Sequence, residues 1–146
     1  MREWPNWKKA KNAAFIFSEA AKNLFTQFNH GMEYKIEEER SLIIPFAVLQ
    51  IFSCELGLKS LLLKQEISFG HIHDLNELFG LLPEETKTNI KCKFTDDCDF
   101  DMELINISNM FINLRYYFEK TEDQNIPYDF INILNKSILD LLGYYE

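Results

Sequence analysis

The most apolar stretch of the chain decides its fold: residues 42–63 read LIIPFAVLQIFSCELGLKSLLL. Apolar residues recur there at steps of three and four and cover most of the circumference of a helix. This pattern is typical of a helix that is buried on several sides. Two charged residues, Glu55 and Lys59, interrupt the stretch, and because of them we do not expect it to span a membrane. We interpret it as the central helix of a bundle.

The sequence on the N-terminal side of this stretch predicts one more long helix. Apolar residues recur with helical spacing along one face over residues 7–28, and Gly31 ends the pattern. We expect the central helix to begin after Ser41, with Pro45 in its opening turn. At that position the missing amide hydrogen of proline removes no helical hydrogen bond.

Four shorter helices are expected on the C-terminal side. Asp74 precedes Glu77 by three residues in the manner of an acidic capping box, which marks the start of the first of them. The expected ranges are about 75–82, 83–91, 101–118 and 127–141. Residues 1–146 are therefore predicted to form one all-α domain, an up-and-down bundle of four to six antiparallel helices.

The composition narrows the classes of partner. The chain has 146 residues, and its 15 basic and 23 acidic side chains give a formal net charge of −8, so it lacks the positive field that attracts duplex DNA.

Its three cysteines are odd in number and lack zinc-ligand spacing, and no basic-then-apolar leader stands at the N-terminus. We therefore expect a cytoplasmic protein without a cofactor or metal, in which Cys54 is a small core residue.

Glu55 and Lys59 form the first of three polar features that packing alone does not explain. An acid followed four residues later by a base suits an ion pair along one helix. Such a pair either lies on the surface, where it adds solubility, or lies partly buried among the surrounding leucines. In the buried case both charges need further partners.

The second feature is the sequence GHIHDL at residues 70–75, which precedes a short helix. Its two histidines and its aspartate could take part in a metal site, but zinc needs three or four protein ligands and His30 is the only other histidine. Alternatively, Asp74 caps the helix and His73 packs against or hydrogen-bonds a neighbouring helix. A functional role also stays open for His73, because imidazole titrates near neutral pH.

The third feature is Arg115. It stands four residues after Phe111 and three before Phe118, which puts it on the apolar face of its own helix. A guanidinium group in that place needs an acidic partner, for which Glu119 and Glu55 are the candidates. The alternative is that the arginine binds a phosphate or another anion in a cleft.

Taken together, the three features resemble the motifs of the HEPN family of small helical domains. The resemblance covers about residues 13–145 and rests on E-x3-K at Glu55 and Lys59, on HDL at 73–75 followed by Leu78 and Phe79, and on RY-x2-E at Arg115, Tyr116 and Glu119. It implies a four- to five-helix bundle that commonly dimerises through helix faces. The resemblance is closest to HEPN domains that are encoded beside minimal nucleotidyltransferases or in other defence and toxin–antitoxin systems.

The family's ribonuclease motif, by contrast, is missing. Active HEPN domains resemble metal-independent ribonucleases that use R-x4-6-H, whereas no histidine follows Arg115 in this chain. The RY-x2-E form resembles the branch that is usually regarded as non-catalytic. The expected ligand-binding residues are Glu55, Lys59, His73, Arg115, Tyr116 and Glu119. They form either a pocket for a nucleotide or RNA phosphate or a closed ion network that specifies helix register.

Three functions follow from these alternatives. The first is a HEPN-like binding module, a homodimer in bacterial defence or a toxin–antitoxin system, that binds a partner protein or a nucleotide or RNA phosphate. A nucleotidyltransferase or an antitoxin is the expected kind of protein partner. The second is a metal-independent ribonuclease in which Arg115 and His73 form the catalytic pair. The third is a purely structural network of Glu55, Lys59 and Arg115. Because these alternatives include a ribonuclease, the sequence leaves open whether the chain is an enzyme.

Overall fold

The computed structural model describes residues 5–30, 36–115 and 126–143, with side chains except at positions 25, 27–30, 36–43, 114 and 115. These residues form helices, turns and loops, and no strand occurs among them. The helices are α1 (Asn6–His30), α2 (Ile36–Lys64), α3 (Leu75–Gly80), α4 (Glu84–Lys91), α5 (Phe100–Arg115) and α6 (Tyr128–Leu141). The prediction of an all-α helical bundle is confirmed.

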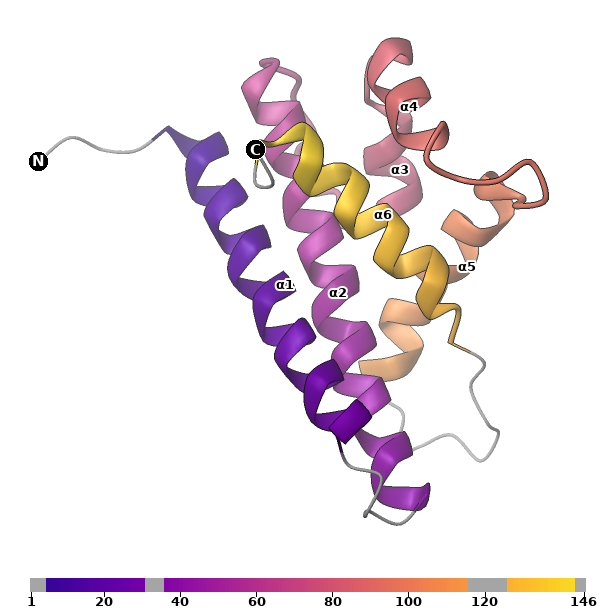
Figure 1. The fold of residues 1–146 in the computed structure, drawn as a ribbon. Helices are drawn as coiled ribbons and strands as arrows, with labels where there is room; N and C mark the ends of the chain where they lie inside the picture. The colour runs from indigo at the N-terminus through magenta and orange to yellow at the C-terminus, as the bar shows by residue number, and fades with distance from the viewer. Residues whose placement is uncertain (1–4, 31–35, 116–125, 144–146) are drawn as a thin grey trace, which may run out of the picture.

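The central position in the bundle belongs to α2. Helix α1 lies beside it along most of its length, and α6 packs across it (Figure 1). Helices α3 and α5 pack on the side of α2 away from α1, and α4 lies next to α3 (Figure 1). Because α2 has neighbours on several sides, its apolar residues cover most of its circumference, as the sequence of residues 42–63 predicts.

The apolar character of α2 is that of a core helix. The segment Ile44–Lys64 would suffice to cross a membrane by length and composition alone, with a mean hydropathy of 1.6. Glu55 and Lys59 therefore do not exclude a membrane span on composition alone, contrary to our expectation. In the structure, however, 67% of this segment is buried inside the protein, as is usual for the central helix of a bundle.

The start of α2 differs from the prediction. The helix begins at Ile36 instead of after Ser41, so that Pro45 lies inside the helix and not in its opening turn. Proline there cannot donate the hydrogen bond to the carbonyl four residues earlier. Pro45 is exposed, which keeps its ring out of the packed interior. The apolar sequence that follows continues the helix on the far side of this local defect.

A close approach between α2 and α6 occurs at Gly57. A Cβ atom added to this glycine would lie 2.5 Å from Cγ2 of Ile138, a side chain that is fully buried. Carbon atoms in contact prefer about 3.5–4.0 Å. Glycine thus lets the two helix backbones come nearer than any other residue at position 57 would.

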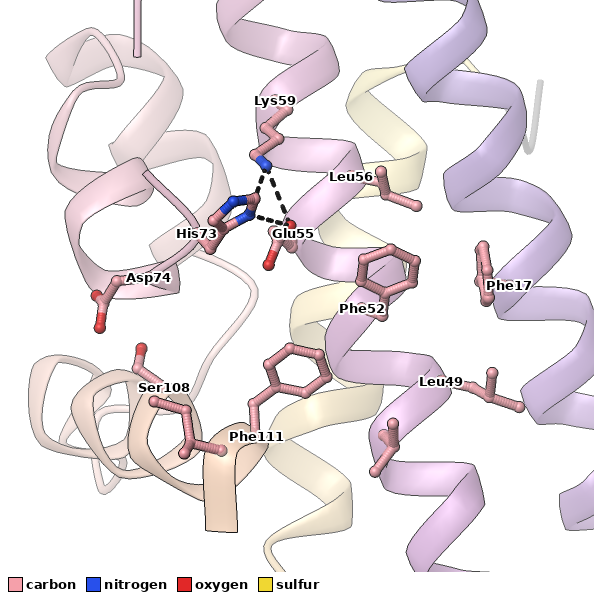
Figure 2. A pocket seen from close by; sticks show the side chains of 12 residues that line it. Phe17, Leu49, Phe52, Glu55, Leu56, Lys59, His73, Asp74, Ser108 and Phe111 are labelled. Carbon is pink, nitrogen blue, oxygen red and sulfur yellow. Dashed lines mark hydrogen bonds and ion pairs between the residues drawn. The ribbon is translucent and has the colours of Figure 1, made fainter. Parts of the chain in front are cut away.

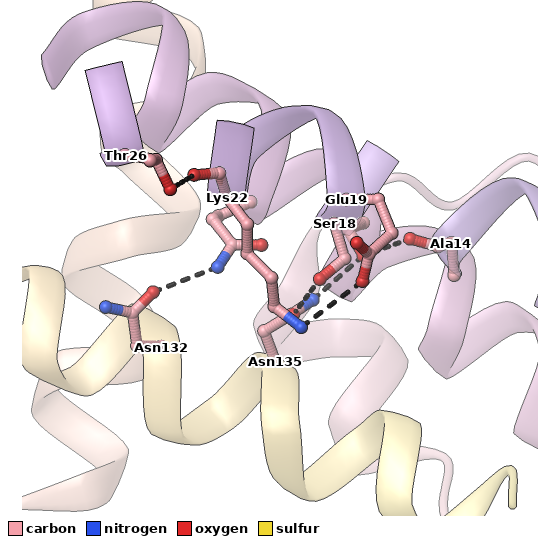
Figure 3. Close-up of polar contacts among 9 residues, drawn as sticks. Ala14, Ser18, Glu19, Lys22, Thr26, Asn132 and Asn135 are labelled. Atoms are coloured by element: carbon pink, nitrogen blue, oxygen red, sulfur yellow. Dashed lines mark hydrogen bonds and ion pairs between the residues drawn. The ribbon is translucent and has the colours of Figure 1, made fainter. Parts of the chain in front are cut away.

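A buried polar network ties α1, α2 and α6 together (Figure 3). The hydroxyl of Ser18 donates to Oδ1 of Asn135 at 2.8 Å, and Nδ2 of Asn135 donates to Oγ of Ser53 at 2.8 Å. Ser53 in turn donates to the carbonyl of Ala14 at 2.6 Å. Cys54 is buried beside this network, which confirms it as a core residue, and burial raises the pKa of its thiol to about 12.

The short helices begin where the sequence predicts. The carboxylate of Asp74 accepts a hydrogen bond from the backbone N–H of Glu77 at 2.9 Å and so caps α3. Helix α4 starts after Pro83 with two acidic residues in its first turn. Their negative charges interact favourably with the positive end of the helix dipole. The described part of α5 ends at Arg115, so the expected extension over 116–118 lies outside the described residues.

Candidate functional site

An elongated groove lies over α2, between α1 and α5 (Figure 2). Its volume is about 760 Å³, and the loop that precedes α3 contributes His73 and Asp74 to its lining. Most of its lining is apolar, and four ionisable side chains stand near the α3 end. The lining residues are Phe17 from α1; Val48, Leu49, Phe52, Glu55, Leu56 and Lys59 from α2; His73 and Asp74 before α3; and Ser108, Phe111 and Ile112 from α5.

Three aromatic rings join the helices that border the groove. The ring of Phe52 meets the ring of Phe17 edge-on, with centroids 4.7 Å apart. On its other side it lies parallel to the ring of Phe111, with an interplanar angle of 6° and centroids 6.3 Å apart. The three side chains are only partly buried, because one side of each faces the groove. The apolar wall therefore comes from α1, α2 and α5 together.

The polar end of the groove is a compact triad. One oxygen of Glu55, Oε2, lies 3.1 Å from Nζ of Lys59 and 3.3 Å from Nδ1 of His73. The Lys59 and His73 nitrogens are themselves 3.0 Å apart. The side chains of Glu55 and Lys59 are only 5% and 14% exposed, whereas His73 is 71% exposed. Of the two alternatives for the ion pair, the structure therefore supports burial.

One arrangement of hydrogens satisfies both contacts of Lys59. A charged Lys59 has several N–H groups and donates both to Oε2 of Glu55 and to Nδ1 of His73. His73 then accepts through Nδ1 and carries its own hydrogen on Nε2. A His73 protonated on both nitrogens would donate to Glu55 but would also face Lys59 as a like charge. In the first arrangement the charges of Glu55 and Lys59 cancel, and the triad is neutral.

The second oxygen of Glu55 is turned away from the triad. Figure 2 shows it pointing away from Lys59 and His73, on the side where Ser108 and Phe111 lie. The described residues make no hydrogen bond to this Oε1 atom, although the side chain as a whole is 95% buried. Glu55 thus presents to the groove an acceptor that no described residue occupies.

A metal ion does not fit the triad well. Among the described residues, no group of three or more His, Cys, Asp and Glu side chains is arranged to hold a metal. Glu55 and His73 supply two ligand atoms, but the ammonium group of Lys59 contacts both of them and would repel a cation placed between them. His71 is exposed and does not line the groove.

The structure brings together three of the six predicted ligand-binding residues, Glu55, Lys59 and His73. The backbone of Arg115 ends the described part of α5, but its side chain lies outside the described residues, as do Tyr116 and Glu119. The sequence did not single out the apolar lining of the groove. Helical periodicity puts those residues on apolar faces, and it does not distinguish a face that meets another helix from one that borders a groove.

Comparison of the chain with protein-family models, with curated proteins and with solved structures finds no match. The resemblance to HEPN domains therefore rests on the motifs alone.

Proposed function

We propose that the chain is a HEPN-like binding module, an up-and-down bundle of antiparallel helices that binds a partner protein through the groove beside α2. The observation that carries this proposal is the long, mostly apolar lining contributed by three helices. Apolar side chains left open to solvent in a groove of this kind are typical of sites that receive the apolar face of another protein segment.

The charges of the groove favour a protein over a nucleotide or RNA phosphate. Among the described side chains that line the groove, Lys59 is the only cation, and its charge is balanced by Glu55 at 3.1 Å. Asp74 adds a further carboxylate at the same end. A phosphate group would enter a site without net positive charge in a chain of net charge −8. The expectation of a phosphate ligand is accordingly the less supported of the two.

The biological setting comes from the resemblance to HEPN domains. We propose that the module acts in the bacterial cytoplasm, in a defence or toxin–antitoxin system, with a nucleotidyltransferase or an antitoxin as the kind of partner expected. We also propose that it is a homodimer. Apolar side chains are also exposed outside the groove, Met102 of α5 among them, and such side chains could contribute to this interface.

Two substitutions on one helix test the proposed site. Ile112 and Ile105 both belong to α5 and are 59% and 48% exposed, but only Ile112 lines the groove. We expect Ile112→Lys to abolish capture of the partner from cells of the native host, and Ile105→Lys to leave it intact. Equal capture by both variants would place the binding site elsewhere.

The alternative function, a ribonuclease that uses Arg115 and His73, has one observation in its favour. His73 is exposed at the rim of the groove, and residue 115 follows the groove residue Ile112 by less than one helical turn. Cleavage of RNA by the pure protein, lost in both Arg115→Ala and His73→Ala while the circular dichroism spectrum is kept, would favour this function over a binding module.

A further inference from the structure

We infer that the partner segment places a basic side chain, lysine or arginine, into the polar end of the groove, where its head group donates to Oε1 of Glu55. This inference rests on the proposed function and names the chemistry of the partner at the same site. The motifs point to an anionic ligand, whereas the group inferred here is a cation. Three observations carry it, namely an unpartnered acceptor, the charge balance of the groove and the aromatic rings beside the carboxylate.

The first observation is the state of the Glu55 carboxylate. Its Oε2 atom accepts from Lys59 and lies 3.3 Å from Nδ1 of His73, whereas Oε1 faces the groove without a hydrogen bond from any described residue. Oε1 is not among the fully buried side-chain atoms without a partner in the described part of the chain, so it stays open to a group that enters the groove. A donor that arrives with the partner would satisfy this oxygen, and a charged donor makes a stronger bond than a neutral one.

The second observation is the balance of charge around this atom. Among the described ionisable side chains that line the groove, Glu55 and Asp74 are acidic and Lys59 is basic, and His73 adds no charge when it accepts from Lys59 through Nδ1. The lining thus carries one excess negative charge within a chain of net charge −8. A cation that enters the groove is attracted both by the nearby lining and by the net charge of the whole chain, and an entering carboxylate or phosphate is repelled.

The third observation is the surroundings of Glu55. The rings of Phe52 and Phe111 line the groove next to the carboxylate (Figure 2). Aromatic faces attract ammonium and guanidinium groups and also pack against the methylene stem that carries them. A lysine or arginine side chain can therefore lay its stem along the rings and direct its head group to Oε1.

A pair of small probes of similar size tests whether the groove prefers a cationic or an anionic ligand. The first probe, 4-phenylbutylamine, carries the butylammonium group of lysine on an aromatic body, and 4-phenylbutyrate carries a carboxylate on the same body. In an NMR titration of the full chain at neutral pH and low salt, we expect the amine to shift signals of groove residues such as Phe52 and Ile112. It should bind about tenfold or more tightly than the carboxylate, as one charge-assisted hydrogen bond implies.

Variants assign this preference to Glu55. Glu55→Gln should remove the difference between the two probes, whereas Glu84→Gln, which changes the net charge equally at a 90% exposed position on α4, should keep it. Lys59→Met should strengthen amine binding, because Glu55 then loses its counter-charge within the protein. Lys59→Met keeps the inference testable if Glu55→Gln fails to fold.

The inference is overturned if the carboxylate binds as tightly as the amine, if neither probe binds in the groove, or if Glu84→Gln weakens amine binding as much as Glu55→Gln does. These outcomes concern only the head group that Glu55 recognises. The proposed function fails separately, when Ile112→Lys and Ile105→Lys capture the same partner equally. A groove that binds its partner without any preference for the amine would refute the inference and leave the binding module standing.

Discussion

The contact between Gly57 and Ile138 makes a sharp prediction about the packing of α2 on α6. In Gly57→Ala the new methyl group would lie 2.5 Å from Cγ2 of Ile138, about 1 Å inside ordinary carbon contact. Ile138 cannot easily rotate away, because β-branched residues in helices keep one strongly preferred χ1 rotamer. The helices must therefore separate, which costs up to about 3 kcal/mol for overpacking of a core.

A second term opposes this cost. Alanine has a helix propensity about 1 kcal/mol more favourable than that of glycine. We therefore expect Gly57→Ala to lower the free energy of unfolding by about 1–2 kcal/mol in the wild-type background. In an Ile138→Ala background the clashing methyl is gone, so that the same substitution at position 57 should raise the free energy of unfolding by about 1 kcal/mol. The effect of one mutation changes sign with the identity of its neighbour.

Urea denaturation of the wild type, the two single variants and the double variant measures this coupling directly. The expected coupling energy is about 2–3 kcal/mol, well above the value of about 0.5 kcal/mol found for independent sites. If Gly57→Ala has the same effect in both backgrounds, or if it stabilises the wild type, the close approach of α2 and α6 at this position is refuted.

Three further predictions concern the buried network, the cap of α3 and the cysteines. Asn135→Leu leaves the hydroxyl of Ser18 without its acceptor and should lower the free energy of unfolding by about 2–4 kcal/mol in urea, whereas no change would contradict the network. Asp74→Ala should cost about 1 kcal/mol by the same assay and Asp74→Ser almost nothing, since serine also caps. Alkylation at pH 8, followed by mass spectrometry, should label exposed Cys92 long before Cys54, because burial raises the pKa of the Cys54 thiol to about 12. Between pH 9 and about 12 the unfolded chain releases a proton that folded Cys54 keeps, so the free energy of unfolding should fall as the pH rises.

The features that the sequence predicts well are those with a local physical cause. The breadth of the apolar pattern over residues 42–63 predicts the central helix, and the spacing of Asp74 and Glu77 predicts the cap of α3. The four-residue spacing of Glu55 and Lys59 predicts their ion pair. Each of these depends on atoms within one or two helical turns, where spacing along the chain determines distance in space.

The features that the sequence does not predict depend on how distant helices meet. Asn135 bonds Ser18, which is 117 residues away, and no local pattern distinguishes it from a surface asparagine. Phe17 and Phe111 lie on apolar faces of their helices, but only the packing of α1 and α5 around α2 leaves a groove between them. The early start of α2, with Pro45 inside the helix, likewise runs against the local preference of proline.

The buried pair of Glu55 and Lys59 also tests whether stability or recognition accounts for these charges. A buried ion pair is often no more stabilising than apolar residues of similar volume, because both charges lose their hydration. We therefore expect the double variant Glu55→Leu/Lys59→Met to unfold in urea at the same free energy as the wild type, or up to about 4 kcal/mol higher. The same variant should lose its preference for 4-phenylbutylamine over 4-phenylbutyrate. If it is instead destabilised by about 3 kcal/mol or more, the pair is a structural network that specifies helix register.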